Sequence, residues 1–284
     1  MSVDYCASKE IDYSGDQDIL SILKNGSTPK SMYQAAKQIQ LKKGVCFLEL
    51  PVSLNAEAEA FGAQILHDQK GVIIQDYIFE NIYDLEKLSP LDVKECSLQT
   101  VLECASLAKN DNVILKLMGP FSVLTSLINP MVLFKSMRKN SILIKSALDI
   151  ILEAQYKYAC QAIKNGVKII SYAEPTGFIE MMGTDKFKEF VGFYTIKLMK
   201  RLEDKLDGSV FHVCGKSCSA LLKCELITKV HHHSEKQTLT DALLDIANKN
   251  EIKFTGFKCI QSNTFDYSIW ELKLNGGQQY EPTL

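Results

Sequence analysis

The residues best suited to chemistry are a histidine and two cysteines in the last third of the chain. His212 and Cys214 end a β-favouring run that Gly215 stops. Residues two apart on a strand point to the same face of a sheet, so an imidazole and a thiol would lie side by side. Cys259 follows another strand-like run, Ile252–Phe257, and is the natural third donor. Such a set predicts a zinc site with one position open for an incoming thiol.

Further polar or unusual residues fall where strands are expected to end. If the sheet is parallel, these positions meet at one edge, which is where such folds keep their chemistry. Glu174 precedes Pro175 and is either a catalytic or metal-approaching carboxylate or a loop cap. Four candidates for cofactor binding share this kind of position, although two of them, Asn55 and Asp76, are equally good turn formers. The four are Asn55, Asp76, Gly119 and Phe121.

The elements that would position these residues alternate between short apolar runs and amphipathic runs from Gly44 onward. This rhythm is typical of βα units and a parallel sheet. The predicted strands are Val45–Leu50, Val72–Asp76, Val113–Met118, Val167–Ala173, Ser209–Cys214, Leu226–Val230, Lys253–Lys258 and Ile269–Leu274. The predicted helices between them are Ala56–Leu66, Leu98–Ala108, Phe121–Ile128, Ser141–Lys164, Asp185–Leu206 and Thr238–Asn248.

About eight such units predict an α/β fold of the TIM (β/α)₈ type, either complete or shortened toward the C-terminus; an open doubly wound sheet is the alternative. Two helices, Asp16–Leu23 and Ser31–Leu41 with Ser31 as cap, would form an N-terminal extension over residues 1–43. Residues 44–284 contain no linker rich in Pro, Gly or Ser, so we expect a single domain there.

Composition narrows the classes of function. The net charge of -2 and the pI near 6.2 argue against binding of nucleic acid. Arg138 and Arg201 are the only arginines, which argues against substrates with many carboxylates or phosphates. Nine scattered cysteines indicate reduced thiols, and no apolar run approaches membrane-spanning length. We therefore expect a cytoplasmic protein without a membrane partner.

Four segments, in order, resemble the uroporphyrinogen decarboxylase superfamily, and within it the cobalamin-dependent methyltransferases most of all. They are Glu57–Ala63, Leu117–Ser122, the run Cys160–Ile170 leading into Tyr172–Pro175, and His212–Gly215. The resemblance implies a TIM barrel whose zinc is held by His212, Cys214 and Cys259, with Glu174 in the place of a carboxylate that approaches the metal when no thiol is bound. It also implies a corrinoid carrier protein as partner and a small thiol, such as coenzyme M, as acceptor.

The expected chemistry is direct displacement. A thiolate held at zinc would attack the methyl carbon of a methyl-Co(III) corrinoid, leaving Co(I) and a thioether. The carrier protein would dock over the carboxyl ends of the strands, because a corrinoid is too large for the barrel interior.

Several alternatives stay open at this point. The interval between Cys214 and Cys259 is shorter than the family leads one to expect, which is consistent with a missing or reduced βα unit. Cys218 is either a rival ligand or a small apolar residue that packs on the next helix. The run His231–His233 is either a metal site or, preferably, a solvated loop. The competing functions are a decarboxylase of tetrapyrrole carboxylates, which would need pocket arginines, and a non-catalytic module that binds a corrinoid protein.

Overall fold

The computed structural model describes residues 28–52, 55–68, 71–262 and 265–275, and the predicted helix Asp16–Leu23 lies outside them. The strands are β1 (Phe47–Leu50), β2 (Gln64–Asp68), β3 (Gly71–Asp76), β4 (Asn112–Met118), β5 (Ile169–Ala173), β6 (Val210–Val213), β7 (Ile227–His233), β8 (Phe254–Gly256) and β9 (Ser268–Leu274). The helices and helical turns are α2 (Pro29–Lys43), α3 (Ala56–Ala60), η1 (Ile82–Lys87), α4 (Leu98–Leu107), α5 (Pro120–Leu127), α6 (Pro130–Ser136), α7 (Ser141–Lys164), α8 (Ile179–Phe187), η2 (Lys188–Gly192), α9 (Phe193–Leu202), η3 (Glu203–Lys205), α10 (Gly215–Lys223) and α11 (Leu239–Lys249).

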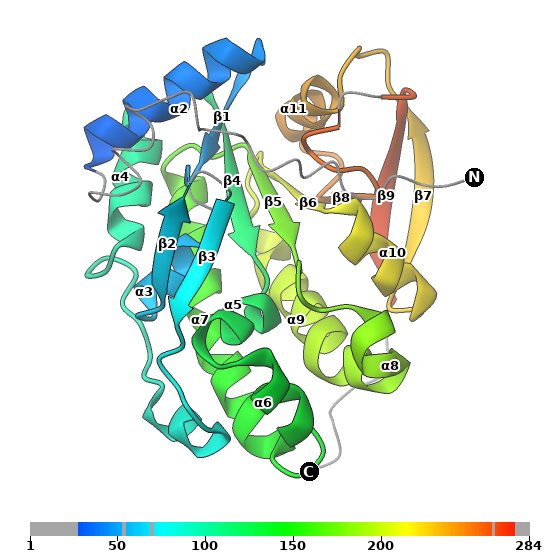
Figure 1. Ribbon diagram of the computed structural model, residues 1–284. Coiled ribbons are helices and arrows are strands. Elements are labelled where there is room, and N and C mark those ends of the chain that lie inside the picture. Colours follow the sequence, from blue (N-terminus) through cyan, green and yellow to red (C-terminus); the bar gives the residue numbers. More distant parts are fainter. Residues whose placement is uncertain (1–27, 53–54, 69–70, 263–264, 276–284) are drawn as a thin grey trace.

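The main sheet has seven strands in the order β1-β4-β5-β6-β8-β9-β7 (Figure 1). The first five run parallel, while β9 is antiparallel to both β8 and β7. This arrangement confirms the α/β, TIM-barrel-like prediction, with an antiparallel pair in place of further βα units at the C-terminal end. Among the described strands, no pairing joins β1 to β7, so the sheet is not closed by hydrogen bonds.

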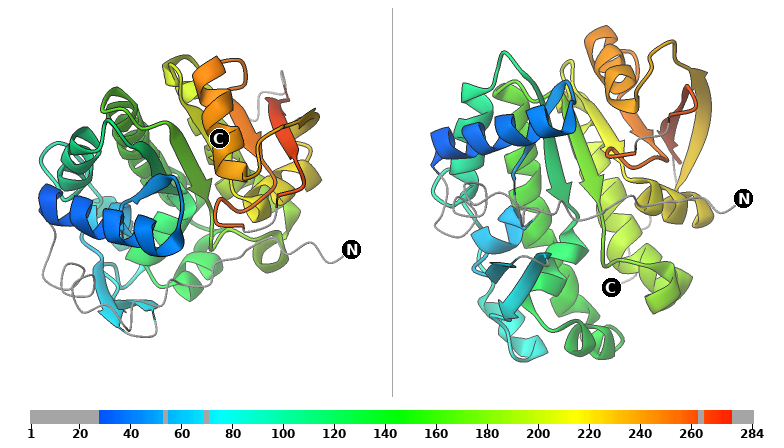
Figure 2. Two further views of the ribbon diagram at one scale, coloured as in Figure 1. Left: turned by 90° about the horizontal axis from the view of Figure 1, so that it is seen from above. Right: turned by 45° about the horizontal axis from the view of Figure 1, so that its top comes forward.

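Each face of the sheet packs against a different layer, because the strands are buried on both sides. One face carries Leu115, Tyr172 and Phe211 and packs against the large helical layer. The other face carries Ile114 and Val210, near the beginnings of their strands, and packs against α11. Figure 2 shows α11 on the side of the sheet away from α4 and α7. We call the α11 side the inner face.

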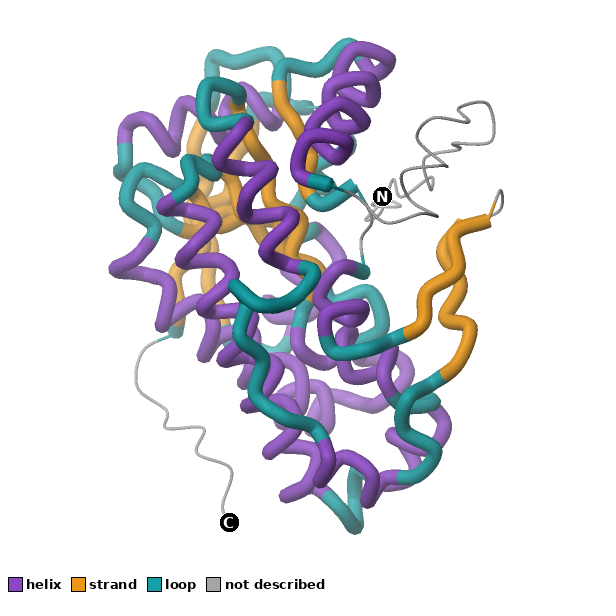
Figure 3. Tube along the Cα trace, turned by 90° about the vertical axis from the view of Figure 1, so that its left-hand side faces the viewer, coloured by secondary structure: helices purple, strands orange, loops and turns teal. Residues whose placement is uncertain are grey.

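One segment folds differently from the prediction. The predicted helix Ala56–Leu66 ends at Ala60, and its last residues form β2. The predicted strand Val72–Asp76 is present as β3, but it pairs with β2 as a separate antiparallel hairpin that projects from the body (Figure 3). Gly62, at φ +97°, makes the turn after α3 that lets the chain enter β2. The placement of Asp76 at the carboxyl edge of the main sheet was therefore wrong.

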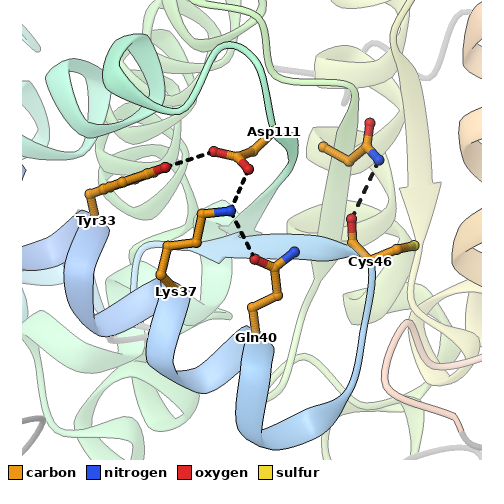
Figure 4. A network of polar contacts seen from close by, with 6 residues as sticks. Tyr33, Lys37, Gln40, Cys46 and Asp111 are labelled. Carbon is orange, nitrogen blue, oxygen red and sulfur yellow. Dashed lines mark hydrogen bonds and ion pairs between the residues drawn. The ribbon is translucent and has the colours of Figure 1, made fainter.

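The N-terminal helix α2 is anchored by polar contacts. Its cap is Thr28 and not Ser31; Thr28 Oγ1 accepts the Ser31 N–H, and Ser31 Oγ accepts the Thr28 N–H. Farther along α2, the hydroxyl of Tyr33 and the ammonium of Lys37 both bind the carboxylate of Asp111, just before β4 (Figure 4).

The other predicted helices are found within a few residues of their expected ends. The predicted Asp185–Leu206 helix is present as consecutive helical segments: the end of α8, then the π-helical turn η2, then α9. Within the described residues, no helix is long and apolar enough to cross a membrane.

Candidate functional site

A row of polar side chains crosses the inner face of the main sheet. The pairing register makes five residues consecutive neighbours on β4, β5, β6, β8 and β9, and in each pair the side chains lie on the same face. The row lies one layer nearer the strand ends than the apolar residues that pack against α11. Its members are Lys116, Ser171, His212, Thr255 and Glu271.

His212 is the most unusual member of this row. It is fully buried, and neither ring nitrogen has a hydrogen-bond partner in the described part of the chain. Burial lowers the pKa of His212 to about 4. The backbone of Lys258 lies beside the ring and favours the protonated form, but it does not meet the geometry of a hydrogen bond. The ring is therefore neutral at pH 7, with a nitrogen lone pair available to a ligand.

Cys214 lies two residues beyond His212, at the N-cap of α10. Its amide donates to the carbonyl of Tyr172 and so extends the β5–β6 pairing to the strand end. Its side chain is half-buried. A helix N-terminus favours negative charge, so this position suits a thiolate.

Cys259 lies in the segment 257–262, which follows β8 and turns across the inner face. Ile260 is buried in the same apolar cluster as Phe47, Ile114 and Val210. Gln261 donates a 3.0 Å hydrogen bond to Glu49 on β1, at the opposite edge of the sheet. The segment therefore starts beside His212 and crosses the inner face near the beginnings of the strands. Phe257 begins it with φ +93°, and its ring stacks on Trp270 at 3.5 Å.

The structure thus places His212 and Cys214 at the end of β6 and only the backbone next to Cys259 beside them, so the predicted ligands are not closed around a metal position. His212, Cys214 and the backbone next to Cys259 converge on β6 and β8. Among the described residues, no group of three or more His, Cys, Asp or Glu side chains is arranged to hold a metal ion. The donor types fit zinc, as do the His212 nitrogens, which lack a partner in the part of the chain that the structure describes. The cysteines would have to turn toward that ring to complete a site.

The rival ligand Cys218 lies on the other face of the sheet. A Cβ on Gly256 would stand 2.7 Å from its sulfur, on the side of the sheet away from His212. Burial raises the pKa of Cys218 to about 12. The expectation that Cys218 packs on the following helix as a small apolar residue is confirmed.

Glu174 is fully occupied by hydrogen bonds. Its carboxylate accepts from the amide of Phe121 at 3.2 Å, from the amide and hydroxyl of Ser122 at 2.9 and 2.6 Å, and from the hydroxyl of Tyr172 at 3.2 Å. Its own amide donates to Ser217 in the first turn of α10. Burial raises the pKa of Glu174 to about 7, against the effect of these donors. Glu174 therefore links the beginnings of α5 and α10.

The four candidates for cofactor binding are spread over the structure. Gly119 and Phe121 lie at the beginning of α5, where they accommodate the carboxylate of Glu174. Asn55 is the N-cap residue of α3. Asp76 is exposed at the end of β3, outside the main sheet. The structure thus groups Gly119 and Phe121 with Glu174 and separates Asp76 from them.

The buried ammonium of Lys116 went unrecognised in the sequence. Lys116 lies 3.7 Å from Glu49, whose other carboxylate oxygen binds Lys43 at 3.0 Å. Burial lowers the pKa of Lys116, and the two lysines outweigh the burial of Glu49 and lower its pKa. The signal was available, because Lys116 interrupts an otherwise apolar strand.

A second buried carboxylate, Glu57, holds the end of β4. Met118 extends past the end of β1, so its peptide groups lack a strand partner on that side. Glu57 accepts the Met118 N–H at 2.8 Å, and the Gln155 amide donates to the Met118 carbonyl. Glu57 Oε2, Gln155 Oε1 and the hydroxyl of Tyr158 have no partner in the described structure. Burial raises the pKa of Glu57 to about 7.

Comparisons with known proteins agree with this architecture. Two curated relatives, both named methylcobamide:CoM methyltransferase MtaA, come from Methanosarcina barkeri and from its strain Fusaro / DSM 804. They are 31% identical over 98 and 102 residues, and each alignment covers 34% of this chain and 28% of the relative. A solved structure of a methyltransferase from Methanosarcina mazei is similar in fold, with a TM-score of 0.60, 22% identity, and coverage of 74% of this chain and 65% of that chain.

The curated matches thus span a little over a quarter of each relative, so they say nothing of the remaining length. The family comparison reaches much farther, because the profile described as uroporphyrinogen decarboxylase (URO-D) matches residues 21–249. That range includes the polar row from β4 to β6, Glu174, His212 and Cys214. The chain belongs to the uroporphyrinogen decarboxylase (URO-D) family.

Proposed function

We propose that this protein is a zinc-dependent methyltransferase that moves a methyl group from a methyl-Co(III) corrinoid, carried by a partner protein, to a small thiol such as coenzyme M. The observation that carries the proposal is His212, a fully buried neutral imidazole whose two nitrogens have no partner among the described residues, two residues before a thiol at a helix N-terminus. The relatives named as methylcobamide:CoM methyltransferases support the choice of donor and acceptor.

His212, Cys214 and Cys259 would hold the zinc. When bound, zinc supplies deprotonation of the acceptor thiol near neutral pH and fixes its sulfur in one place. The chain's own contribution is position. The β6 strand would hold the imidazole, α10 would stabilise negative charge at Cys214, and Cys259 would come from the segment 257–262, whose Lys258 backbone lies beside the His212 ring.

Glu174 is best assigned to positioning. All four of its carboxylate contacts come from α5 and β5, and its amide holds Ser217 in the first turn of α10. Because Cys214 is the N-cap residue of α10, Glu174 fixes the helix that carries a proposed ligand. A role in which the carboxylate approaches the metal would require it to give up these contacts.

The second candidate, a decarboxylase of tetrapyrrole carboxylates, would need guanidinium groups in the pocket. Arg138 is exposed in the turn between α6 and α7, and Arg201 on α9 binds Glu153 at 2.7 Å. Both lie off the inner face, which favours the methyltransferase. The third candidate, a corrinoid-protein binding module, differs from the enzyme only in turnover.

The experiment is methyl transfer from free methylcobalamin to a panel of small thiols, followed by the appearance of Co(I). We expect transfer by the zinc-loaded wild type and its loss in Cys214→Ala and Cys259→Ala. Cys46→Ala is the matched control, because Cys46 is an exposed cysteine preceding β1. Transfer that survives both ligand substitutions would rule out the proposed site. Binding of methylcobalamin without transfer would favour the binding module.

A further inference from the structure

The three consecutive histidines of the chain lie on a strand and not in the solvated loop that the sequence favoured. His231, His232 and His233 are the last residues of β7. β7 is an edge strand of the main sheet. Among the described strands, it pairs only with β9. A regular strand fixes the directions of these side chains, which a loop would not.

Alternation along β7 separates the three rings. His231 pairs directly with Trp270, and their ring centroids are 5.0 Å apart. His233, two residues on, lies on the same face, where its ring is 6.1 Å from that of Tyr267. His232 points to the opposite face, where its Nε2 is 2.9 Å from the carboxylate of Glu271. Two imidazoles thus share one face, and the third is held away from them.

The pair on the shared face has the properties of a chelate. Both residues are exposed, and no hydrogen bond or ion pair is assigned to either ring within the described residues. Side chains two apart on a strand start about 7 Å from one another. Metal–nitrogen bonds of about 2.1 Å let two such imidazoles lean toward one shared ion, with water in the remaining positions.

We propose that His231 and His233 form a surface site for one late first-row divalent metal ion, separate from the proposed zinc site. Imidazole suits Cu²⁺, Ni²⁺ and Zn²⁺, and the affinity of such ligands is highest for Cu²⁺. The ammonium of Lys229 lies over the Trp270 ring at 3.3 Å, beside His231 and not between the two histidines. It weakens the site by repulsion without blocking it.

The chain contains its own reporter for this site. Trp270 is the only tryptophan, so its fluorescence reports on the surroundings of His231. The probe is Ni²⁺ alone, titrated into the full-length protein, because Ni²⁺ is paramagnetic and, unlike Cu²⁺, does not oxidise thiols. We expect saturable quenching of Trp270. His231→Asn and His233→Asn should each weaken binding about ten-fold or more, since each removes one of two ligands.

His232→Asn is the matched control, because it removes an imidazole from the same strand but from the other face. It should bind Ni²⁺ within about two-fold of wild type. Any binding of Ni²⁺ at another site should be the same in all variants, so it cancels when they are compared. The proposal is overturned if His232→Asn weakens binding as much as His231→Asn, or if the His231→Asn/His233→Asn double variant is quenched like wild type. An unchanged thermal midpoint shows that each substitution leaves the fold intact.

Discussion

Gly119 and Glu174 occupy complementary space at the ends of neighbouring strands. A Cβ added to Gly119 would overlap the carboxyl carbon of Glu174. The backbone of Gly119, at φ -72° and ψ 159°, is one that any residue adopts. Glycine is therefore required here by the volume of Glu174 and not by backbone conformation. The Gly-Pro-Phe run at the end of β4 and the Glu-Pro run at the end of β5 thus form one structural unit.

Gly119→Ala should destabilise the protein by about 1–3 kcal/mol or more, because the added methyl group must displace a fully buried carboxylate. The measurement is the free energy of unfolding in urea. Glu174→Ala removes the obstacle, so the same alanine should cost much less in that background. The predicted coupling between the two substitutions is on the order of 1 kcal/mol or larger. Strict additivity would contradict the contact.

Glu174→Gln should lower the free energy of unfolding by about 1–3 kcal/mol, because an amide NH₂ would face donors that now bind a carboxylate. Glu180→Gln is the control, since Glu180 is exposed on the nearby helix α8. Zinc affinity should fall only in Glu174→Gln, because a shift at this strand end moves the Glu174 amide that holds Ser217 in the first turn of α10. A Glu174→Gln protein that matches Glu180→Gln in both measurements would show that the carboxylate contacts carry little energy.

Glu57→Gln should stabilise the protein at pH 8. The pKa of Glu57 is raised from 4.5 to about 7, so between these pH values the folded protein holds a proton that the unfolded chain has lost. The contribution of Glu57 to stability therefore declines as pH rises through this window, by on the order of 3 kcal/mol. Glutamine keeps the acceptor for Met118 and does not titrate.

The measurement is unfolding in urea at pH 5 and pH 8 for wild type and Glu57→Gln. The difference between the two proteins isolates Glu57, because His212, whose lowered pKa acts with the opposite sign, is common to both. Glu57→Ala is the control for packing and should be less stable at both pH values. A wild type–variant difference that is the same at pH 5 and pH 8 would contradict the account of Glu57.

Lys116→Met should cost about 3 kcal/mol, since it leaves Glu49 in the interior with only Lys43 as counter-charge. Glu49 is held at 3.0 Å by both Lys43 and Gln261, so its own removal also frees the segment that carries Cys259. Replacing both members of the pair, as Glu49→Leu/Lys116→Met, should recover much of the loss in unfolding free energy. A double variant as unstable as the sum of the single ones would contradict a coupled buried pair.

The sequence predicted strands well where they are short and continuously apolar, because such runs are buried on both faces wherever they pair. The prediction of a single helix over Ala56–Leu66 was wrong. The same spacing of apolar residues fits one long helix or a five-residue helix followed by a strand, and only pairing with β3 selects the second. Asp76 was misplaced for the same reason, since an antiparallel hairpin and a barrel strand look alike in one dimension.

The proposed metal donors could be named from the sequence, but their surroundings could not. His212 and Cys214 were paired by strand periodicity alone. The row from Lys116 to Glu271 depends on inter-strand register, and the enclosure of Glu174 depends on contacts between segments about fifty residues apart. The strand assignment of His231–His233 likewise required its partner, β9.

The most direct test of the account is the zinc content of the protein after dialysis against metal-free buffer, which removes weakly held surface ions. We predict one zinc ion per chain in the wild type and in Cys46→Ala, and a marked loss in Cys214→Ala and Cys259→Ala. A wild type without stoichiometric zinc, or a Cys259→Ala protein that keeps it, would contradict the central claim that His212, Cys214 and Cys259 hold one metal ion.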